Sequence, residues 1–138
     1  MEFSRRKALV IGFGGLAAAM LPIPAFALVD EAVAAFTGGA TAGTGGITIT
    51  APEIAENGNT VPVEVSAPGA VSIILLAAGN PNPAVCQFNF GPMAAKQSAS
   101  TRIRLSQTQD VIALAKMADG SFVQTQATVK VTIGGCGG

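Results

Sequence analysis

The residues of this sequence best suited to do chemistry form the pentapeptide GGCGG, in which one thiol is surrounded by residues without side chains. The pentapeptide comprises Gly134, Gly135, Cys136, Gly137 and Gly138. Glycine loses more conformational freedom on ordering than any other residue, so four glycines favour a moving segment over a rigid site. We therefore predict a flexible arm that reaches up to ~17 Å and carries the Cys136 thiol to a site on another protein. The alternative is a frayed terminus with an incidental cysteine.

The Cys136 thiol lacks the neighbours that activate a nucleophile, because no Lys, Arg or His lies beside it in the sequence. We expect a modest nucleophile that is activated by whichever enzyme receives the arm. The chain is accordingly interpreted as a substrate carrier that acts with separate enzymes. We predict no catalytic residues, no cofactor-binding residues and no metal ligands of its own.

The second cysteine, Cys86, is expected to be an inert core residue. In the segment AVCQFNF it alternates onto the same face as Phe88 and Phe90, where a free cysteine packs as a small hydrophobic side chain. A disulfide between Cys86 and Cys136 is the alternative. That bond would require Cα atoms within about 7 Å and would immobilise the glycine-rich arm.

The composition argues against several classes of protein. The chain has no His, so it cannot build a Ser-His or Cys-His nucleophile pair or an imidazole metal site. Residues 28–138 carry five basic and seven acidic side chains without a basic block, which argues against nucleic-acid binding. The acidic residues are scattered, and no two of them stand in a recognisable catalytic setting.

The first 27 residues have the pattern of a cleaved export signal. Basic residues at 5–7 precede an apolar run at 8–21, and the sequence Ala-Phe-Ala at 25–27 is a small-x-small cleavage site. The Ser-Arg-Arg sequence at 4–6 indicates the twin-arginine type, which places the mature protein in the bacterial periplasm. One alternative is a membrane anchor, although the apolar run is shorter than the ~20 residues that span a bilayer. The other is ordinary unfolded export with an incidental arginine pair.

Residues 47–133 show the period-two pattern of β-strands. Apolar and polar residues alternate in five segments, which are 47–50, 61–65, 84–90, 102–105 and 129–133. Turn residues such as Pro68-Gly69 and Asp119-Gly120 lie between these segments and two further apolar ones. About seven short strands at this spacing predict an all-β fold, an immunoglobulin-like antiparallel β-sandwich.

A short helix and a Gly-rich joint are predicted at 28–46, before the sandwich. Asp30 is placed to cap the helix, Val33 and Phe36 share one face, and Gly38-Gly39 end it. The stretch that follows has no periodicity, which is typical of a flexible joint.

Two predicted strands, at 71–76 and 111–117, are apolar on both faces. A strand of a two-layer sandwich needs only one apolar face, so the second face must be covered. Because the predicted helix is short, we favour a partner subunit as the cover. The chain's own helix is the alternative.

Several segments resemble the SoxY family, the thiol-bearing subunits of the SoxYZ sulfur carrier. The ending VTIGGCGG is similar to the family's C-terminus, and further similarity covers nearly all of the chain after the export signal. The similar segments are PEIAENGNTVPVEV from Pro52, GNPNP from Gly79 and STRIRLSQTQDVIALAKMADGSF from Ser100. Cys86 departs from the family pattern, which does not call for a thiol at that strand position.

This resemblance implies a function in thiosulfate oxidation. It implies an immunoglobulin-like sandwich paired with a SoxZ subunit, and Cys136 as the attachment site for inorganic sulfur. It further implies that the c-type cytochrome SoxAX joins thiosulfate to the thiol and that the hydrolase SoxB releases sulfate. In some organisms the sulfane dehydrogenase SoxCD then oxidises the remaining sulfur. The cofactors belong to these partners, and the carrier has none.

Two other classes of function remain open at this point. One is a periplasmic adhesion or assembly module whose Cys136 forms an intermolecular disulfide. The other is a thiol oxidoreductase, which lacks support because the sequence has no C-x-x-C motif and no activating neighbours.

Overall fold

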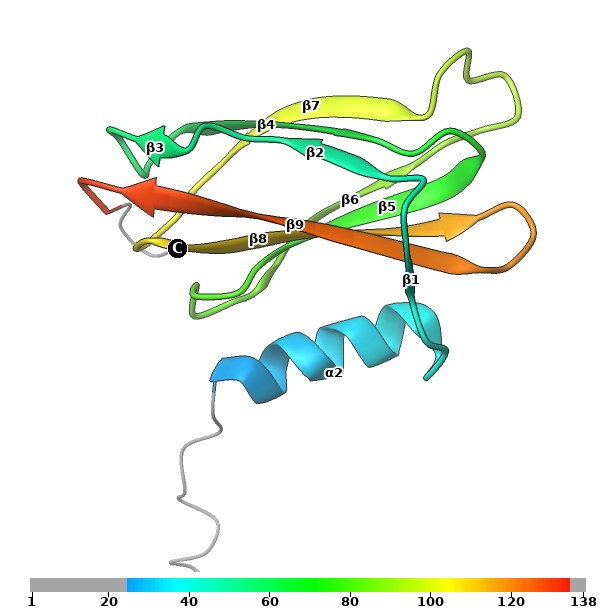
Figure 1. Cartoon of the computed structure of the whole chain (residues 1–138), viewed down its shortest axis with the longest axis horizontal. Helices are drawn as coiled ribbons and strands as arrows, with labels where there is room; N and C mark the ends of the chain where they lie inside the picture. Colours follow the sequence, from blue (N-terminus) through cyan, green and yellow to red (C-terminus); the bar gives the residue numbers. More distant parts are fainter. Residues whose placement is uncertain (1–24, 135–138) are drawn as a thin grey trace, which may run out of the picture.

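The computed structural model describes residues 25–134, which form one helix and two β-sheets. The elements, in chain order, are α2 (Ala25–Thr37), β1 (Gly43–Thr44), β2 (Thr48–Thr50), β3 (Ile54–Ala55), β4 (Val61–Ser66), β5 (Ala70–Ala77), β6 (Ala84–Asn89), β7 (Ser98–Ile103), β8 (Gln109–Met117) and β9 (Phe122–Val131). The two sheets lie face to face as layers (Figure 1), so the predicted β-sandwich with a short N-terminal helix is confirmed.

The larger sheet has the strand order β1-β9-β8-β5-β6, with β3 also paired to β9, and the smaller sheet has the order β2-β4-β7. Neighbouring strands pair antiparallel except β1 and β3, which run parallel to β9. The chain changes sheet at every step from β1 to β5, and again after β6 and after β7. The end of β9, β3, the β5–β6 turn and the β7–β8 connection all lie at one end of the sandwich (Figure 1).

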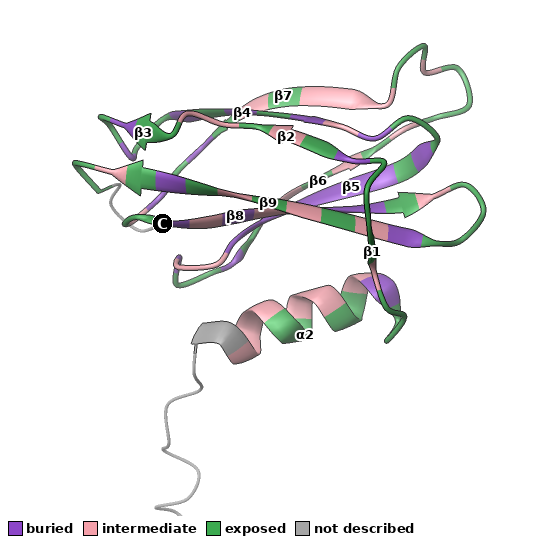
Figure 2. Ribbon diagram, in the orientation of Figure 1, coloured by how far each residue is buried: buried purple, intermediate pink, exposed green. Residues whose placement is uncertain are grey.

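The core lies between the sheets and follows from the alternation along the strands. In β4 the side chains of Val61, Val63 and Val65 are buried, whereas Pro62 and Glu64 are exposed. The opposite sheet fills the same space with buried side chains of β5, β8 and β9, namely Ile73, Leu75, Val111, Ala113 and Val129. The alternation of buried and exposed positions is visible along these strands in Figure 2.

Helix α2 covers the outer face of β5 and β8. The buried side chains of this face are Ile74, Leu76 and Leu114. They are packed against one side of the helix, which includes Val33 and Phe36 as predicted. The Phe36 ring also meets the Phe122 ring edge-on, with centroids 5.7 Å apart. The preference for a partner subunit as the cover of this face was therefore wrong, because the chain's own helix buries it.

The helix begins earlier than the sequence suggested. It starts at Ala25, so Asp30 lies within it, and the capping role predicted for Asp30 was wrong. It ends as predicted after Thr37, where Gly38 and Gly39 adopt φ of 65° and 91°. Glycine reaches this left-handed region without the steric cost that a Cβ imposes, which explains why the helix stops here.

Most of the predicted export signal lies outside the described residues, which begin at residue 25. Cleavage at the predicted site would remove the first three residues of α2 and leave residues 28–37, which include the helical side chains packed on the sheet. In the described range 25–134 no helix is long and apolar enough to cross a membrane.

The described strands differ most from the predictions at β1, β3, β7 and β9. The predicted joint contains strand β1, which pairs with β9. Gly43 lies opposite Val123, and Thr44 lies opposite Gln124. Strand β7 covers 98–103 instead of 102–105, and β9 covers 122–131 instead of 129–133. The first halves of β7 and β9 are rich in Ser, Thr and Gln, so their pattern of apolar residues is too weak to mark them as strands.

Candidate functional site at the root of the arm

Gly134 is the single residue of the predicted arm that belongs to the described part of the chain. The others lie outside it, namely Gly135, Cys136, Gly137 and Gly138. The structure therefore shows the place at which the predicted arm would leave the domain. We call residues 132–134 the arm root; they follow directly on Val131, the last residue of β9.

Backbone hydrogen bonds fix one side of the arm root to the end of β3 and to the turn that follows it. The Thr132 N–H donates to the Ala55 carbonyl at 3.1 Å, and the Gly58 N–H donates to the Ile133 carbonyl at 2.7 Å. The Gly58 carbonyl in turn accepts a hydrogen bond of 2.8 Å from the Leu105 N–H. The same turn thus holds the arm root and the β7–β8 connection together.

The other side of the arm root lies against the backbone of Ser106. A Cβ added at Gly134 would collide with the Ser106 carbonyl oxygen and would lie 3.2 Å from its carbonyl carbon. Both are backbone atoms, so no change of rotamer relieves the overlap. Glycine is required at this position because the backbone of Ser106 packs closely against it. The flexibility of the arm is a separate requirement for glycine and stays a prediction.

A buried hydrogen-bond network positions Ser106. The Asn80 side chain is 3% exposed, and its Oδ1 accepts from the Ser106 N–H at 3.0 Å and from the Ser106 Oγ–H at 3.1 Å. The same oxygen accepts from Gln109 Nε2 at 2.8 Å, while Asn80 Nδ2 donates to the Arg104 carbonyl at 2.8 Å. Four hydrogen bonds on one buried amide define the backbone path that faces Gly134.

Sequence reasoning missed this network. The sequence predicts a turn in the GNPNP segment that contains Asn80, and this segment is one of those that resemble the family. Its asparagines are equally typical of exposed turns, so no sequence signal separates the buried Asn80 from the exposed Asn82.

Cys86 is half-buried, not fully buried as expected. Cys86 pairs with Leu75 and Ala84 pairs with Leu76, so the register shifts and Val85 is an extra residue in β6. Val85 and Cys86 both contact the core as a result, at the open edge of the sheet. Burial raises the pKa of the Cys86 thiol above its ordinary value, which agrees with an unreactive residue. Cys136, the partner in the alternative of a disulfide, lies outside the described residues, so the structure does not test that alternative.

Within residues 25–134, no three His, Cys, Asp or Glu side chains gather closely enough to hold a metal ion.

Comparison with known proteins identifies the relatives of this chain. The family described as "Sulfur oxidation protein SoxY" matches residues 33–136. Among solved structures, the sulfur carrier protein SoxY from Chlorobium limicola f thiosulfatophilum is 35% identical, over 78% of this chain and 98% of that chain, with a TM-score of 0.68. No curated protein sequence matches the chain.

More distant structures share the fold. Superoxide reductase (neelaredoxin) from Ignicoccus hospitalis is 22% identical, over 64% of this chain and 81% of that chain, with a TM-score of 0.56. A putative superoxide reductase from Thermotoga maritima is 17% identical, over 62% and 84% of the two chains, with a TM-score of 0.52. At these identities the similarity shows a common sandwich and carries no statement about activity.

Proposed function

Because the chain belongs to the SoxY family of sulfur oxidation proteins, we propose that it is a covalent carrier that holds intermediates of thiosulfate oxidation on the Cys136 thiol. The observation that carries this proposal is the extent of the family match, which runs to residue 136 and so includes the cysteine. The arm root supports it, because a fixed backbone at Ile133 and Gly134 gives the following residues a defined point of departure.

The proposed chemistry at the thiol occurs in two steps. In the first, the Cys136 thiol loses its proton and joins the sulfane sulfur of thiosulfate through a new S–S bond, and two electrons pass to a c-type cytochrome, SoxAX. In the second, water attacks the sulfone sulfur, so that sulfate leaves and a persulfide remains on Cys136. SoxB catalyses this hydrolysis, and SoxCD oxidises the persulfide where it is present. The carrier supplies the thiol and its presentation, and the partners supply the cofactors.

The proposal includes a SoxZ subunit and a periplasmic location. The periplasmic location rests on the export signal predicted at residues 1–27. In the periplasm the carrier would meet its oxidising partners. The outer face of β5 and β8 is already covered by α2, so SoxZ would bind to another surface of the sandwich.

The test is the mass of the protein as it exists in cells. The mature protein is purified without reductant from cells grown on thiosulfate, and its intact mass and peptides are measured. We expect sulfur-containing adducts on Cys136 that reductant removes, and none on a Cys136→Ser variant purified in parallel. A bare thiol on all molecules would contradict the carrier function. A dimer linked through Cys136 and insensitive to thiosulfate would show an assembly module instead.

A further inference from the structure

A small polar pocket lies beside the arm root, between the start of β6 and the end of β7. Its volume is about 260 Å³, and its polar lining comes from Asn80, Asn82, Arg102 and Arg104. It contains no acidic side chain. The pocket is therefore a concave site of one charge sign, with a size suited to a small anion.

Within residues 25–134, the two arginines have no charged partner. Arg102 Nη1 has a long contact of 3.5 Å with the hydroxyl oxygen of Thr60, an uncharged partner. In the described part of the chain neither guanidinium forms an ion pair with a carboxylate. A guanidinium presents several N–H donors in a planar fork that matches the oxygens of a sulfonate or sulfate group. Arg102 and Arg104 can therefore give their charge and donors to a ligand.

The pocket and the arm root share a wall. Asn80 lines the pocket and also holds the backbone of Ser106, against which Gly134 packs. The Asn80 amide donates to the Arg104 carbonyl, which fixes the backbone that carries this arginine. Cys136 lies two residues beyond Gly134, a distance of at most ~7 Å of extended chain, and a sulfur adduct on its thiol reaches further. A group carried on Cys136 is therefore tethered to the wall that the pocket and the arm root share.

We propose that this pocket binds the oxyanion end of the sulfur adduct on Cys136, with Arg102 and Arg104 as the recognising groups. This inference rests on the proposed carrier function. A thiosulfonate adduct is anionic at its sulfonate end, whereas the free thiol is neutral, so the pocket holds the arm when it is loaded and releases it when it is empty. The tether raises the effective concentration of the adduct at the pocket far above that of any free oxyanion. The pocket also shields the adduct from reductants until a partner enzyme removes it.

The experiment uses the mature chain with Cys86→Ala, loaded chemically with tetrathionate. The Cys136 thiolate displaces thiosulfate from tetrathionate, so one S–S bond breaks, one forms, and no further oxidant is required. Residues 28–138 contain two arginines, and their Nε–Hε signals in NMR spectra report directly on the pocket. We expect both signals to shift on loading. The matched control is alkylation of Cys136 with iodoacetamide, which gives a neutral adduct and should leave both signals in place.

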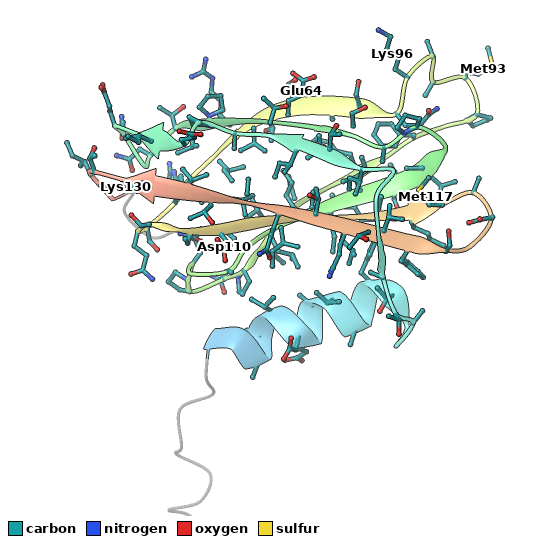
Figure 3. All side chains as sticks on the ribbon, viewed as in Figure 1. Glu64, Met93, Lys96, Asp110, Met117 and Lys130 are labelled. Atoms are coloured by element: carbon teal, nitrogen blue, oxygen red, sulfur yellow. The ribbon has the colours of Figure 1, made fainter. Side chains whose placement is uncertain are left out.

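A second measurement tests the consequence for the adduct. Removal of the thiosulfonate by a phosphine reductant should be faster in the Arg102→Gln, Arg104→Gln double variant, on the order of tenfold, because charged hydrogen bonds no longer hold it. Both side chains are exposed, so the variant should fold and unfold like the parent. Lys96→Gln is the charge control. Lys96 lies at the opposite end of the sandwich from Lys130 (Figure 3), and Lys130 is two residues before the arm root, so Lys96 is far from the arm root.

Free oxyanions distinguish the two possible sources of the ligand. Millimolar sulfate or thiosulfate added to the Cys136→Ser variant tests whether the pocket binds an untethered anion. Shifts in the loaded protein, with or without shifts on free anions, support the proposal. Shifts with free anions alone, equal shifts with the neutral adduct, or an unchanged removal rate in the double variant would overturn it. Since loading here is chemical, absence of adducts in cells would contradict the carrier function and leave this result intact.

Discussion

Substitution of Gly134 by Ala tests whether the arm root is fixed. The added Cβ would overlap the Ser106 carbonyl oxygen, and an overpacked position of this kind costs ~1–3 kcal/mol if the backbone stays in place. The arm root can instead shift away at Ile133 and Gly134, because β9 ends at Val131 and the hydrogen bonds of Thr132 lie before the shift. Such a shift breaks the hydrogen bond from Gly58 to Ile133, which contributes about 1 kcal/mol. Loss of this hydrogen bond costs less free energy than the overlap, so we expect the arm root to detach.

Detachment has three measurable consequences. The free energy of unfolding should fall by about 1 kcal/mol, which lowers Tm by roughly 4 °C in a domain of this size. The Gly58 amide should lose protection against hydrogen exchange, because its acceptor has moved. The rate at which a partner enzyme loads Cys136 should also fall, because the thiol now starts from a less defined position.

The control for this experiment is Gly91→Ala, because a Cβ at Gly91 has no atom within 4 Å and its φ is not positive. This variant should change neither Tm nor the exchange of Gly58. If Gly134→Ala also leaves the Gly58 amide protected and Tm unchanged, the contact with Ser106 does not hold the arm root and the reasoning is refuted.

Three further predictions follow from other parts of the structure. Asn80→Ala removes four hydrogen bonds from a buried network and should cost ~3 kcal/mol in chemical denaturation; a loss below 1 kcal/mol would show that water replaces the amide. Phe36→Ala removes the edge-on contact with Phe122 and uncovers the outer face of the sheet, so we expect a loss of about 2 kcal/mol and increased binding of a hydrophobic dye; unchanged dye binding would contradict the covering role of α2. In a Cys136→Ser variant, the alkylation rate of Cys86 should keep rising beyond the pH at which an ordinary thiol ionises, because burial raises its pKa; a rate that levels off at or below that pH would contradict the burial.

The sandwich could be predicted because its strands alternate strongly. In β4 the three valines point inward and Pro62 and Glu64 point outward, as the period-two pattern requires. The cover of β5 and β8 could not be assigned in the same way. The pattern shows that Ile74 and Leu114 need a second packing surface, but it does not show whether that surface belongs to the same chain. In this structure the helix of the same chain covers the face, and this needs no association with another subunit.

The role of Gly134 could not be predicted, because two opposite requirements select the same residue. A moving arm needs glycine for its freedom, and a close backbone contact needs glycine for its lack of a Cβ. The sequence GGCGG satisfies both, so only the position of Ser106 separates Gly134 from the glycines beyond it. Cys86 illustrates a related limit, since the extra residue in β6 changes which side chains face the core.

The fixed root changes how the arm should be treated physically. If the whole pentapeptide moved freely, the thiol would sample a volume set by all five residues, and the domain would have little influence on where it spends its time. With Ile133 hydrogen-bonded to Gly58 and Gly134 packed against Ser106, the predicted arm begins one residue later, and each of its conformations would start from the same point. The shorter tether raises the local concentration of the thiol and its adducts around the adjoining surface. A weak pocket at Arg102 and Arg104 is then sufficient to hold a charged adduct, although the same pocket would bind a free anion poorly.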